Sequence, residues 1–342
     1  MSSFKKAIRV TAVFLVLVLV LSVGLIAYYY HRGVYTYEDA KVRKNLAGQL
    51  DLLICGASGS QVSVNPDVLD AVLGTTSYNL GSPRLLLHAR TTLLQKELAR
   101  NPVKTVLLEV SLDILSQDED ATDYARGEAR MLTRLDSFAE RVDYCRTYIP
   151  AKNYVQLYAI SLRYGLESLL ARLTGATSKI FVPIRGYREN AVHDVTILPD
   201  QLEALHNSER LPPVRAENLA ELQKMVDLCR AREVRVIVVI TPTSDGFHWK
   251  LANEAESWDV LQDFCRRNGL TVLNFDLDRE RRERFSEATS FSDDNHLCSE
   301  GAHVFSPLFA ETVKRVLAGE DVSAMFYDSY AEMEADSPYA EP

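Results

Sequence analysis

The sequence predicts an α/β protein: a three-layer sandwich with a parallel, doubly wound sheet of about five strands. A largely helical insertion and an N-terminal transmembrane helix complete the expected architecture. Three observations lead to this prediction. Short apolar runs alternate with amphipathic stretches in two parts of the chain, the alternation stops between them, and an uncharged apolar segment precedes both. Strands that are apolar throughout and separated by helices are typical of a parallel sheet covered on both faces.

Each predicted strand is a short apolar run bounded by turn-forming or polar residues. The runs cover residues 52–55, 76–80, 103–110, 234–240 and 270–275. Stretches with helical spacing separate or follow them, at residues 66–73, 84–100, 217–230, 252–268 and 301–317. The first of these has Pro66 at its start and Gly74 just past its end, which is typical of a helix. Right-handed connections between such elements lead to a doubly wound sheet.

The alternation stops between residues 116 and 213. Two long stretches there, 123–148 and 154–173, have helical character, and a poorly periodic segment follows them. A structureless loop of that length is improbable inside a compact domain, so we expect an insertion that leans over the carboxyl edge of the sheet. The insertion is rich in tyrosine. Its rings could line a glycan or lipid groove, pack the insertion itself, or meet a membrane surface.

The N-terminal apolar segment has the length of a membrane span. Residues 10–27 carry no charge, and a bilayer core requires about 20 such residues in a helix. Three tyrosines at 28–30 suit the membrane interface. A cleaved signal peptide would have a shorter apolar region and a small-residue exit, so we favour an uncleaved anchor. Basic residues on both sides barely decide the orientation, but the short head favours an extracytoplasmic main domain.

These patterns divide the chain into five parts. The predicted organisation is residues 1–30 as cytoplasmic head and anchor, 31–49 as connector, 50–115 with 214–318 as the α/β domain, 116–213 as the insertion, and 319–342 as an acidic, disordered tail.

Composition excludes some functions. The net charge of −9 argues against nucleic-acid binding, which needs a basic surface. No Gly-rich loop suited to phosphate and no spaced set of metal ligands is evident, so we expect neither a cofactor nor a metal. The five cysteines include no Cys-x-x-Cys pair and are interpreted as free thiols.

A serine follows the first predicted strand at the edge where α/β sheets place reactive groups. Ser58 lies between Gly56 and Gly59, which permit a sharp turn that exposes its hydroxyl. Backbone N–H groups beside it could face a developing oxyanion. Taken alone, the same pattern also fits a plain turn in which Ser58 caps a helix.

A second stretch, after the last predicted strand, supplies the partners that such a serine needs. Asp293 precedes His296 by three residues in one loop, so its carboxylate can accept from the imidazole Nδ1–H while Nε2 takes a proton from a hydroxyl. Asp294 is a rival for the acid role. The alternative is a surface loop in which His296 is solvated. Because both stretches fall at one edge of the sheet, we expect them to converge.

These motifs resemble the SGNH/GDSL hydrolase-like superfamily. The resemblance rests on Gly56-Ala57-Ser58 behind the first strand, Asn79-Leu80-Gly81 ending the second, and Asp293-x-x-His296 before the last helix. The N-terminal span makes the chain similar to the membrane-anchored branch, which includes the D-alanyl-lipoteichoic-acid biosynthesis protein D and O-acyltransferase-like proteins of surface-glycan systems. The resemblance to this superfamily covers residues 50–115 and 215–315, and it does not extend to the insertion.

The resemblance implies roles for individual residues. Ser58 would be the nucleophile, His296 the general base and Asp293 its orienting acid, while the backbone N–H groups of Ser58 and Gly81 would form the oxyanion hole. The family usually adds an Asn donor after the third strand, which this chain lacks. Asn79 or Ser111 would substitute, or the hole keeps only its backbone donors. One missing donor costs about 3 kcal/mol of transition-state stabilisation.

The function expected from the sequence is therefore an extracytoplasmic serine esterase or O-acyltransferase that works through an acyl-serine intermediate. The expected partners are the bilayer, a cell-envelope glycan or lipid-linked polymer as substrate, and a multi-spanning membrane O-acyltransferase. Two alternatives stay open: a catalytically inactive accessory or binding protein of a surface-glycan system, and an anchored hydrolase that faces the cytoplasm.

Overall fold

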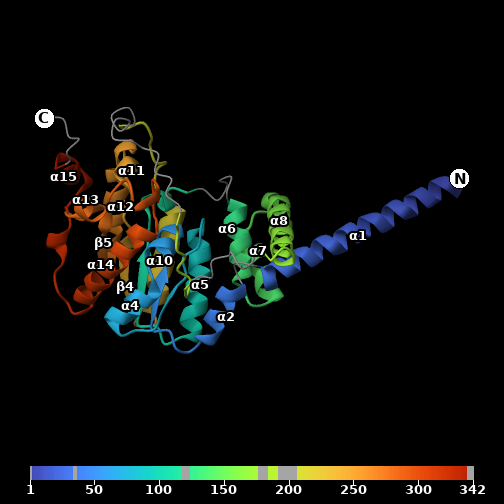
Figure 1. Ribbon diagram of the computed structural model, residues 1–342, viewed down its shortest axis with the longest axis horizontal. Helices are drawn as coiled ribbons and strands as arrows, with labels where there is room; N and C mark the ends of the chain where they lie inside the picture. The colour runs from blue at the N-terminus through green and yellow to red at the C-terminus, as the bar shows by residue number, and fades with distance from the viewer. Residues whose placement is uncertain (1, 34–36, 118–123, 176–183, 192–205, 337–342) are drawn as a thin grey trace. The chain divides into compact units, whose positions relative to one another are not determined.

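The computed structural model describes residues 2–33, 37–117, 124–175, 184–191 and 206–336 (Figure 1). The chain divides into two compact units, Met1–Val42 with Thr122–Val182, and Arg43–Ala121 with Pro183–Pro342. The middle of the predicted insertion forms a unit with the N-terminal helix, whereas both ends of the insertion belong to the α/β unit.

The α/β unit contains the predicted parallel sheet. Its strands are β1 (Leu52–Cys55), β2 (Ser77–Asn79), β3 (Thr105–Glu109), β4 (Arg235–Ile240) and β5 (Thr271–Asn274). They lie in the order β2-β1-β3-β4-β5, and every neighbouring pair is parallel. Nearly all their side chains are buried, which explains why each strand is a continuous apolar run. The α/β fold class is confirmed.

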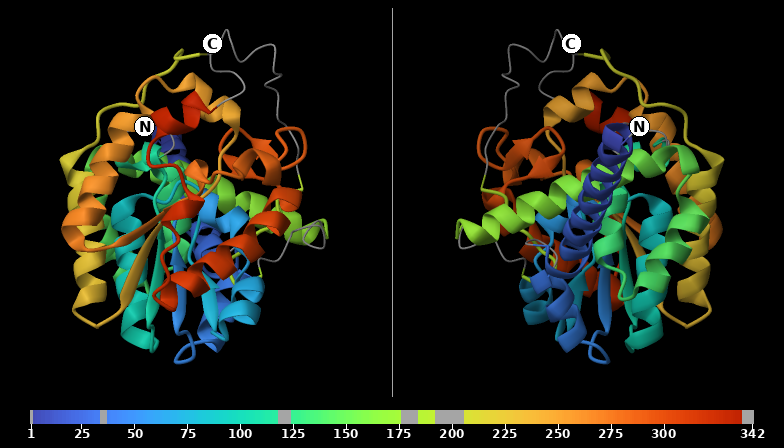
Figure 2. Two further views of the ribbon diagram at one scale, coloured as in Figure 1. Left: turned by 90° about the vertical axis from the view of Figure 1, so that its left-hand side faces the viewer. Right: turned by 90° about the vertical axis from the view of Figure 1, so that its right-hand side faces the viewer.

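Helices cover both faces of this sheet (Figure 2). The elements are α3 (Ser58–Ser63), α4 (Pro66–Leu73), α5 (Leu87–Arg100), α10 (Ala216–Arg230), α12 (Glu254–Asn268) and α14 (Ser299–Leu317). On one face α4 and α14 pack together, and Phe305 and Phe309 of α14 join Ile54 and Ile237 of the strands in one apolar core. On the other face α5 contacts α10. Since strand side chains alternate between faces, both helical layers are needed to cover them.

Short elements surround the carboxyl edge of the sheet, and the sequence did not predict them. They are η1 (Leu112–Leu115), α11 (Asp245–Lys250), η4 (Phe275–Leu277), α13 (Arg281–Arg284), β6 (Phe291–Asp293) and β7 (His296–Leu297). The last two form an antiparallel hairpin in which Asp293 pairs with His296. The segment expected as a loop before the last helix is thus a small, defined ribbon.

The C-terminal segment also differs from the expected disorder as far as residue 336. It contains η5 (Ser323–Met325) and α15 (Tyr330–Ala335). The Tyr330 and Met333 side chains are buried, and Tyr330 packs against Trp258 of α12. The acidic residues lie on the outer side of this short helix, so composition alone suggested a solvated tail while two apolar side chains attach it to the α/β unit.

The other unit is helical. It contains α1 (Ser2–Arg32), α6 (Tyr124–Thr133), α7 (Phe138–Tyr148), η2 (Ala151–Asn153) and α8 (Tyr154–Leu173), and α2 (Tyr37–Asn45) links it to the α/β unit along the chain. The single helix expected over 123–148 is broken, because Ser137 caps α7 by accepting the Glu140 N–H. Among the described residues, Phe4–Arg32 alone is long and apolar enough to cross a membrane, with a mean hydropathy of 3.0.

Candidate active site

Three side chains from distant parts of the sequence meet at the carboxyl edge of the sheet. Ser58 is the first residue of α3, directly after β1, and its Oγ lies 2.7 Å from His296 Nε2. The other ring nitrogen of His296 lies 2.8 and 3.0 Å from the two carboxylate oxygens of Asp293. The order hydroxyl, imidazole, carboxylate is the arrangement in which a histidine can take the proton of a serine.

The β6–β7 hairpin holds the acid and the imidazole together. Asp293 Oδ1 accepts the backbone N–H of Asn295, which closes the turn and fixes the carboxylate above the imidazole. Burial opposes ionisation of Asp293, but its hydrogen bonds and charge interaction with His296 outweigh burial. The pKa of Asp293 therefore lies below its ordinary value, and the carboxylate is charged at neutral pH.

Asp294, the rival acid, points elsewhere. Its carboxylate accepts from Lys250 Nζ at 2.8 Å, and its carbonyl accepts the backbone N–H of Ser244 at 2.9 Å. These two bonds attach the hairpin to α11 and its preceding loop. Asp293 is consequently the carboxylate next to the imidazole, while Asp294 anchors the turn that carries it.

A buried glutamate lies beneath the serine loop, and sequence reasoning gave it no role. Glu109, the last residue of β3, accepts the backbone N–H of Ala57 at 2.6 Å. A Cβ on Gly56 would lie 2.3 Å from the same carboxylate, so only glycine fits there. Burial raises the pKa of Glu109, which the nearby guanidinium of Arg90 partly offsets. A lone carboxylate inside the apolar run 103–110 was the signal that could have identified it.

Two of the predicted oxyanion donors, Asn79 and Gly81, already donate hydrogen bonds within the protein. The amide of Asn79 is fully buried and donates to the carbonyls of Ser60 and Val64, at 2.8 and 2.9 Å. Its oxygen accepts the Gly81 N–H at 2.8 Å. In this conformation Asn79 has no donor left for a substrate, and the Gly81 N–H is engaged. Asn79 thus acts as a bracket between β2 and α3, contrary to its suggested donor role.

The other two predicted oxyanion donors are the backbone N–H of Ser58 and the Ser111 side chain. Ser58 and Gly59 begin α3, where the first N–H groups of a helix have no partner within that helix. Ser111 precedes η1, and within the described residues no hydrogen bond joins its side chain to Ser58 or His296. The remaining candidate donors are therefore the N–H groups at the start of α3.

A segment from the later part of the predicted insertion connects the two halves of the site. The Arg188 N–H donates to the Gln61 carbonyl of α3 at 2.9 Å. Two residues later, the Asn190 side chain donates to Ser292 Oγ in β6 at 2.7 Å, and its carbonyl accepts the Ser299 N–H of α14 at 2.7 Å. Both the serine helix and the histidine hairpin are thus hydrogen-bonded to the same short segment.

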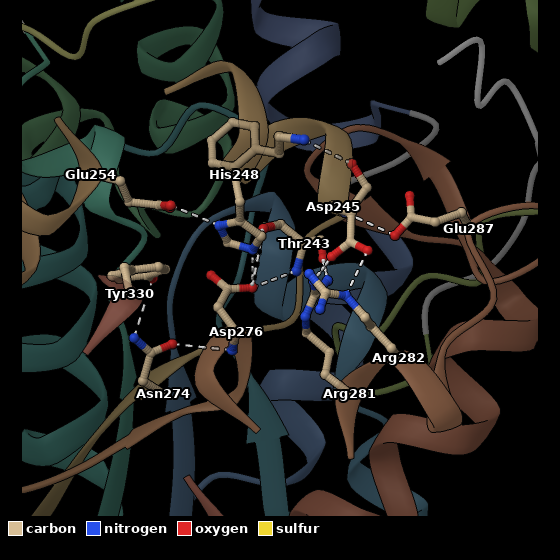
Figure 3. A network of polar contacts seen from close by, with 12 residues as sticks. Thr243, Asp245, His248, Glu254, Asn274, Asp276, Arg281, Arg282, Glu287 and Tyr330 are labelled. Carbon is tan, nitrogen blue, oxygen red and sulfur yellow. Dashed lines mark hydrogen bonds and ion pairs between the residues drawn. The ribbon is translucent and has the colours of Figure 1, made fainter. Parts of the chain in front are cut away.

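Behind the hairpin lies a buried polar network centred on His248 (Figure 3). Its Nδ1 lies 2.8 Å from Glu254, and its Nε2 lies 3.2 Å from Asp276 and 2.9 Å from the Thr243 hydroxyl. Burial alone would lower the pKa of His248, but the two carboxylates dominate and raise it well above the ordinary value. We therefore treat His248 as a buried imidazolium.

The same network fixes α11. Asp245 accepts from Arg281 and from Arg282, the latter at 2.9 Å, and its backbone N–H donates to Glu287 at 2.8 Å. His248, Glu254 and Asp276 also bring ligand-type atoms within 4.8 Å of one another. In this structure both nitrogens of His248 are hydrogen-bonded, Nδ1 to Glu254 and Nε2 to Asp276 and Thr243, so we describe the cluster as a paired imidazolium. The network supports the loop that holds Asp294.

The comparisons with known proteins do not assign an activity to this chain. No family model and no curated protein matches the sequence. Among solved structures, the chain is similar to a Bacteroides fragilis protein provisionally described as an acylhydrolase, with 12% identity and a TM-score of 0.40. The match covers 84% of this chain and 99% of that one. At this identity and overlap the likeness does not identify an activity, so the function has to be argued from geometry.

Proposed function

We propose that the chain is a membrane-anchored serine acyl hydrolase or O-acyltransferase of the SGNH type. The observation that carries the proposal is the contact of 2.7 Å between Ser58 Oγ and His296 Nε2, with Asp293 on the opposite ring nitrogen. A serine alcohol is a poor nucleophile until a base removes its proton, and this geometry supplies the base and the group that orients it.

The proposed reaction has two steps. Ser58 Oγ attacks the acyl carbonyl carbon while its proton moves to His296 Nε2, and the N–H groups at the start of α3 stabilise the oxyanion. Collapse of the tetrahedral intermediate breaks the ester bond, and His296 gives the proton to the leaving alcohol. In the second step His296 takes a proton from water or from an acceptor hydroxyl, whose oxygen attacks the acyl-serine. The bond between the acyl carbon and Ser58 Oγ then breaks, and His296 returns the proton to Ser58 Oγ.

The apolar helix α1 supports an anchored version of this activity. We propose that α1 spans the membrane and that the α/β unit works on its outer side, on acyl groups of a cell-envelope polysaccharide or lipid-linked polymer. A multi-spanning membrane O-acyltransferase that supplies the acyl group would be the matching partner. These points rest on the length and hydropathy of α1 and on the family resemblance of the motifs.

A second candidate function is an acyl-binding accessory protein that does not turn over. The engaged Gly81 N–H and the saturated Asn79 amide favour it, because they leave fewer donors for an oxyanion than a fast hydrolase uses. Hydrolysis of a simple aryl acetate separates the two. Turnover that disappears in His296→Ala supports the enzyme, and absence of turnover by the intact protein supports the accessory role.

The decisive test is covalent labelling of the serine. The full chain in detergent should react with a fluorophosphonate probe, and Ser58→Ala should abolish the label. Ser63→Ala is the matched control, because Ser63 lies on the same short helix and its hydroxyl makes no hydrogen bond in the described part of the chain. Equal labelling of Ser58→Ala and the intact protein would remove Ser58 from the mechanism.

A further inference from the structure

The segment 184–190, which we call the strap, begins at the edge of the sheet in the α/β unit. Ile184 and Tyr187 exchange two backbone hydrogen bonds, of 2.9 and 3.0 Å, and so close a tight turn. Between them, the Arg185 carbonyl accepts the backbone N–H of Asn79 at 2.9 Å. Because β2 is the outermost strand on this side, the strap adds a backbone hydrogen bond to its free edge.

Two further features hold this turn in place. A Cβ on Gly186 would lie 1.8 Å from the Asn79 carbonyl oxygen, so the strap approaches the strand as closely as only glycine permits. The Arg185 guanidinium also pairs with the carboxylates of Asp67 and Asp70 on α4. The start of the strap is therefore a fixed point from which the rest of the strap extends toward the candidate site.

The later half of the strap joins the serine helix to the histidine hairpin. The Arg188 N–H donates at 2.9 Å to the Gln61 carbonyl, three residues after Ser58 on α3. Two residues further along, Asn190 Nδ2 donates to Ser292 Oγ in β6 at 2.7 Å. Two residues of fully extended chain span at most about 7 Å. The strap therefore limits how far the two halves of the site can separate.

Ser292 passes the contact with Asn190 on to His296. Its side chain is buried, and its hydroxyl donates to the His296 carbonyl at 3.3 Å. A hydroxyl has one proton to donate, so its other partner, the Asn190 amide, has to be the donor. The two hydrogen bonds therefore run in one direction, from Asn190 through Ser292 to the backbone of His296. The Asn190 carbonyl accepts the Ser299 N–H at 2.7 Å, which fixes Asn190 from the α14 side.

We propose that Asn190 is a positioning residue that, through Ser292, holds the His296 imidazole at the distance from Ser58 that proton transfer requires. Asn190 acts on the backbone that carries the imidazole, and the imidazole acts on the serine. A displacement of about 1 Å between reacting groups can lower a rate by about 10²-fold, so a contact outside the reacting atoms can have a large effect. This inference rests on the proposed acyl-transfer function.

The test is a double-mutant cycle on the full chain in detergent, with hydrolysis of a simple aryl acetate as the readout. Asn190→Ala and Ser292→Ala should each lower kcat by about 10- to 10²-fold and change KM by less than about twofold, because the lost positioning acts on the chemical step. The double variant should lose about as much as the more impaired single variant, since both changes break the same pair of hydrogen bonds.

Two further variants separate positioning from a general loss of structure. Asn190→Asp keeps the shape of the side chain but offers only an acceptor at neutral pH, so the Ser292 hydroxyl should turn to it and leave the His296 carbonyl. We expect the same loss of kcat as in Asn190→Ala, with an unchanged urea-unfolding midpoint. Glu189→Gln is the matched control, because Glu189 belongs to the strap but lies 3.9 Å from His303 of α14, and its kcat should equal that of the intact protein.

Each outcome decides something. Unchanged kcat in Asn190→Ala or in Asn190→Asp, with turnover still dependent on His296, would overturn this inference and leave the proposed function in place. Losses that multiply in the double variant would overturn the route through Ser292. A rise in KM alone would mark Asn190 as a substrate contact and overturn the positioning role. Absence of His296-dependent turnover by the intact protein would overturn the proposed function, and this inference with it.

Discussion

The two adjacent aspartates of the hairpin provide a matched pair of substitutions. Asp293→Asn removes the acceptor that orients His296, and we expect it to lower kcat/KM by about 10²- to 10⁴-fold. Asp294→Asn removes only the partly buried pair with Lys250 and leaves the backbone bond to Ser244, so the loss should stay below about tenfold. The kcat/KM for hydrolysis of a simple aryl acetate measures both losses. A larger loss for Asp294→Asn would exchange the roles of the two residues.

Glu109 provides a prediction about stability. Glu109→Ala leaves the Ala57 N–H without its acceptor and removes the carboxylate nearest to the buried Arg90, so unfolding should become easier by about 3–5 kcal/mol. Glu109→Gln keeps an oxygen acceptor of similar size and should cost less. Urea unfolding in detergent measures both values. If Glu109→Ala were as stable as the intact protein, the carboxylate would not support the serine loop.

At the residue scale, the sequence predicted candidate residues that lie close together along the chain, but not the contacts between residues far apart along it. Asp293 and His296 are three residues apart in one turn, and Ser58 follows an obvious strand, so spacing and family resemblance pointed to them. Their convergence depended on the parallel sheet, which the sequence also predicted. The contacts of Asn190 join positions about a hundred residues apart in the sequence. No local sequence pattern indicates such a contact, so sequence analysis did not identify the segment around Asn190 that links both halves of the site.

At the element scale, the predicted strands and most helices agree with the structure because burial on both faces leaves a clear apolar signal. The helix predicted at 66–73 coincides with α4, and the one at 154–173 coincides with α8. The hairpin β6–β7 is too short to show periodicity, and a hydroxyl cap broke the helix expected over 123–148. The acidic tail was misread because charge dominates its composition, whereas Tyr330 and Met333 determine its packing.

Helix α15 therefore carries a testable stability contribution. Tyr330→Ala removes a buried ring that packs on Trp258 and whose hydroxyl accepts from Asn274 at 3.2 Å. We expect a loss of about 3–5 kcal/mol in the free energy of unfolding. Glu334→Ala, an exposed change on the same helix, should stay within about 0.5 kcal/mol. Equal stabilities for the two variants would show that this segment does not pack on the α/β unit and is the solvated tail that its composition suggested.

At the scale of the whole molecule, each unit has its own chemistry. The helical unit combines the long apolar helix α1 with a partly exposed α8, which suits contact with lipid. The α/β unit buries an unusual concentration of charge close to its candidate site: His248, two carboxylate partners and Arg281 are all buried. The raised pKa of His248 means that the folded α/β unit binds a proton at this site more tightly than the unfolded chain does, and this ties the stability of the molecule to pH.

The sign of that dependence follows from the raised pKa of His248. Below the unfolded-state pKa of about 6.5, both states are protonated and the attraction to Glu254 and Asp276 contributes fully. As pH rises above that value, only the folded state holds the proton, so stability falls by about 1.4 kcal/mol per pH unit until the folded pKa is reached. Glu254, whose own pKa burial raises, is among the other titratable groups around this network, together with Glu287, Tyr330, Arg281, Asp245 and Arg282, and these groups shape the curve further.

Two measurements check this expectation. Urea unfolding at pH 6 and pH 8 should show the intact protein less stable at pH 8, and the exposed change His303→Gln should keep the same difference. Nitrogen NMR of histidine-labelled protein, assigned with His248→Gln, should show both ring nitrogens of His248 protonated at pH 7. A neutral His248 at pH 7 would contradict the prediction directly. In that case the buried carboxylates would have to be neutralised by their own protons, and α11 would be held without an imidazolium.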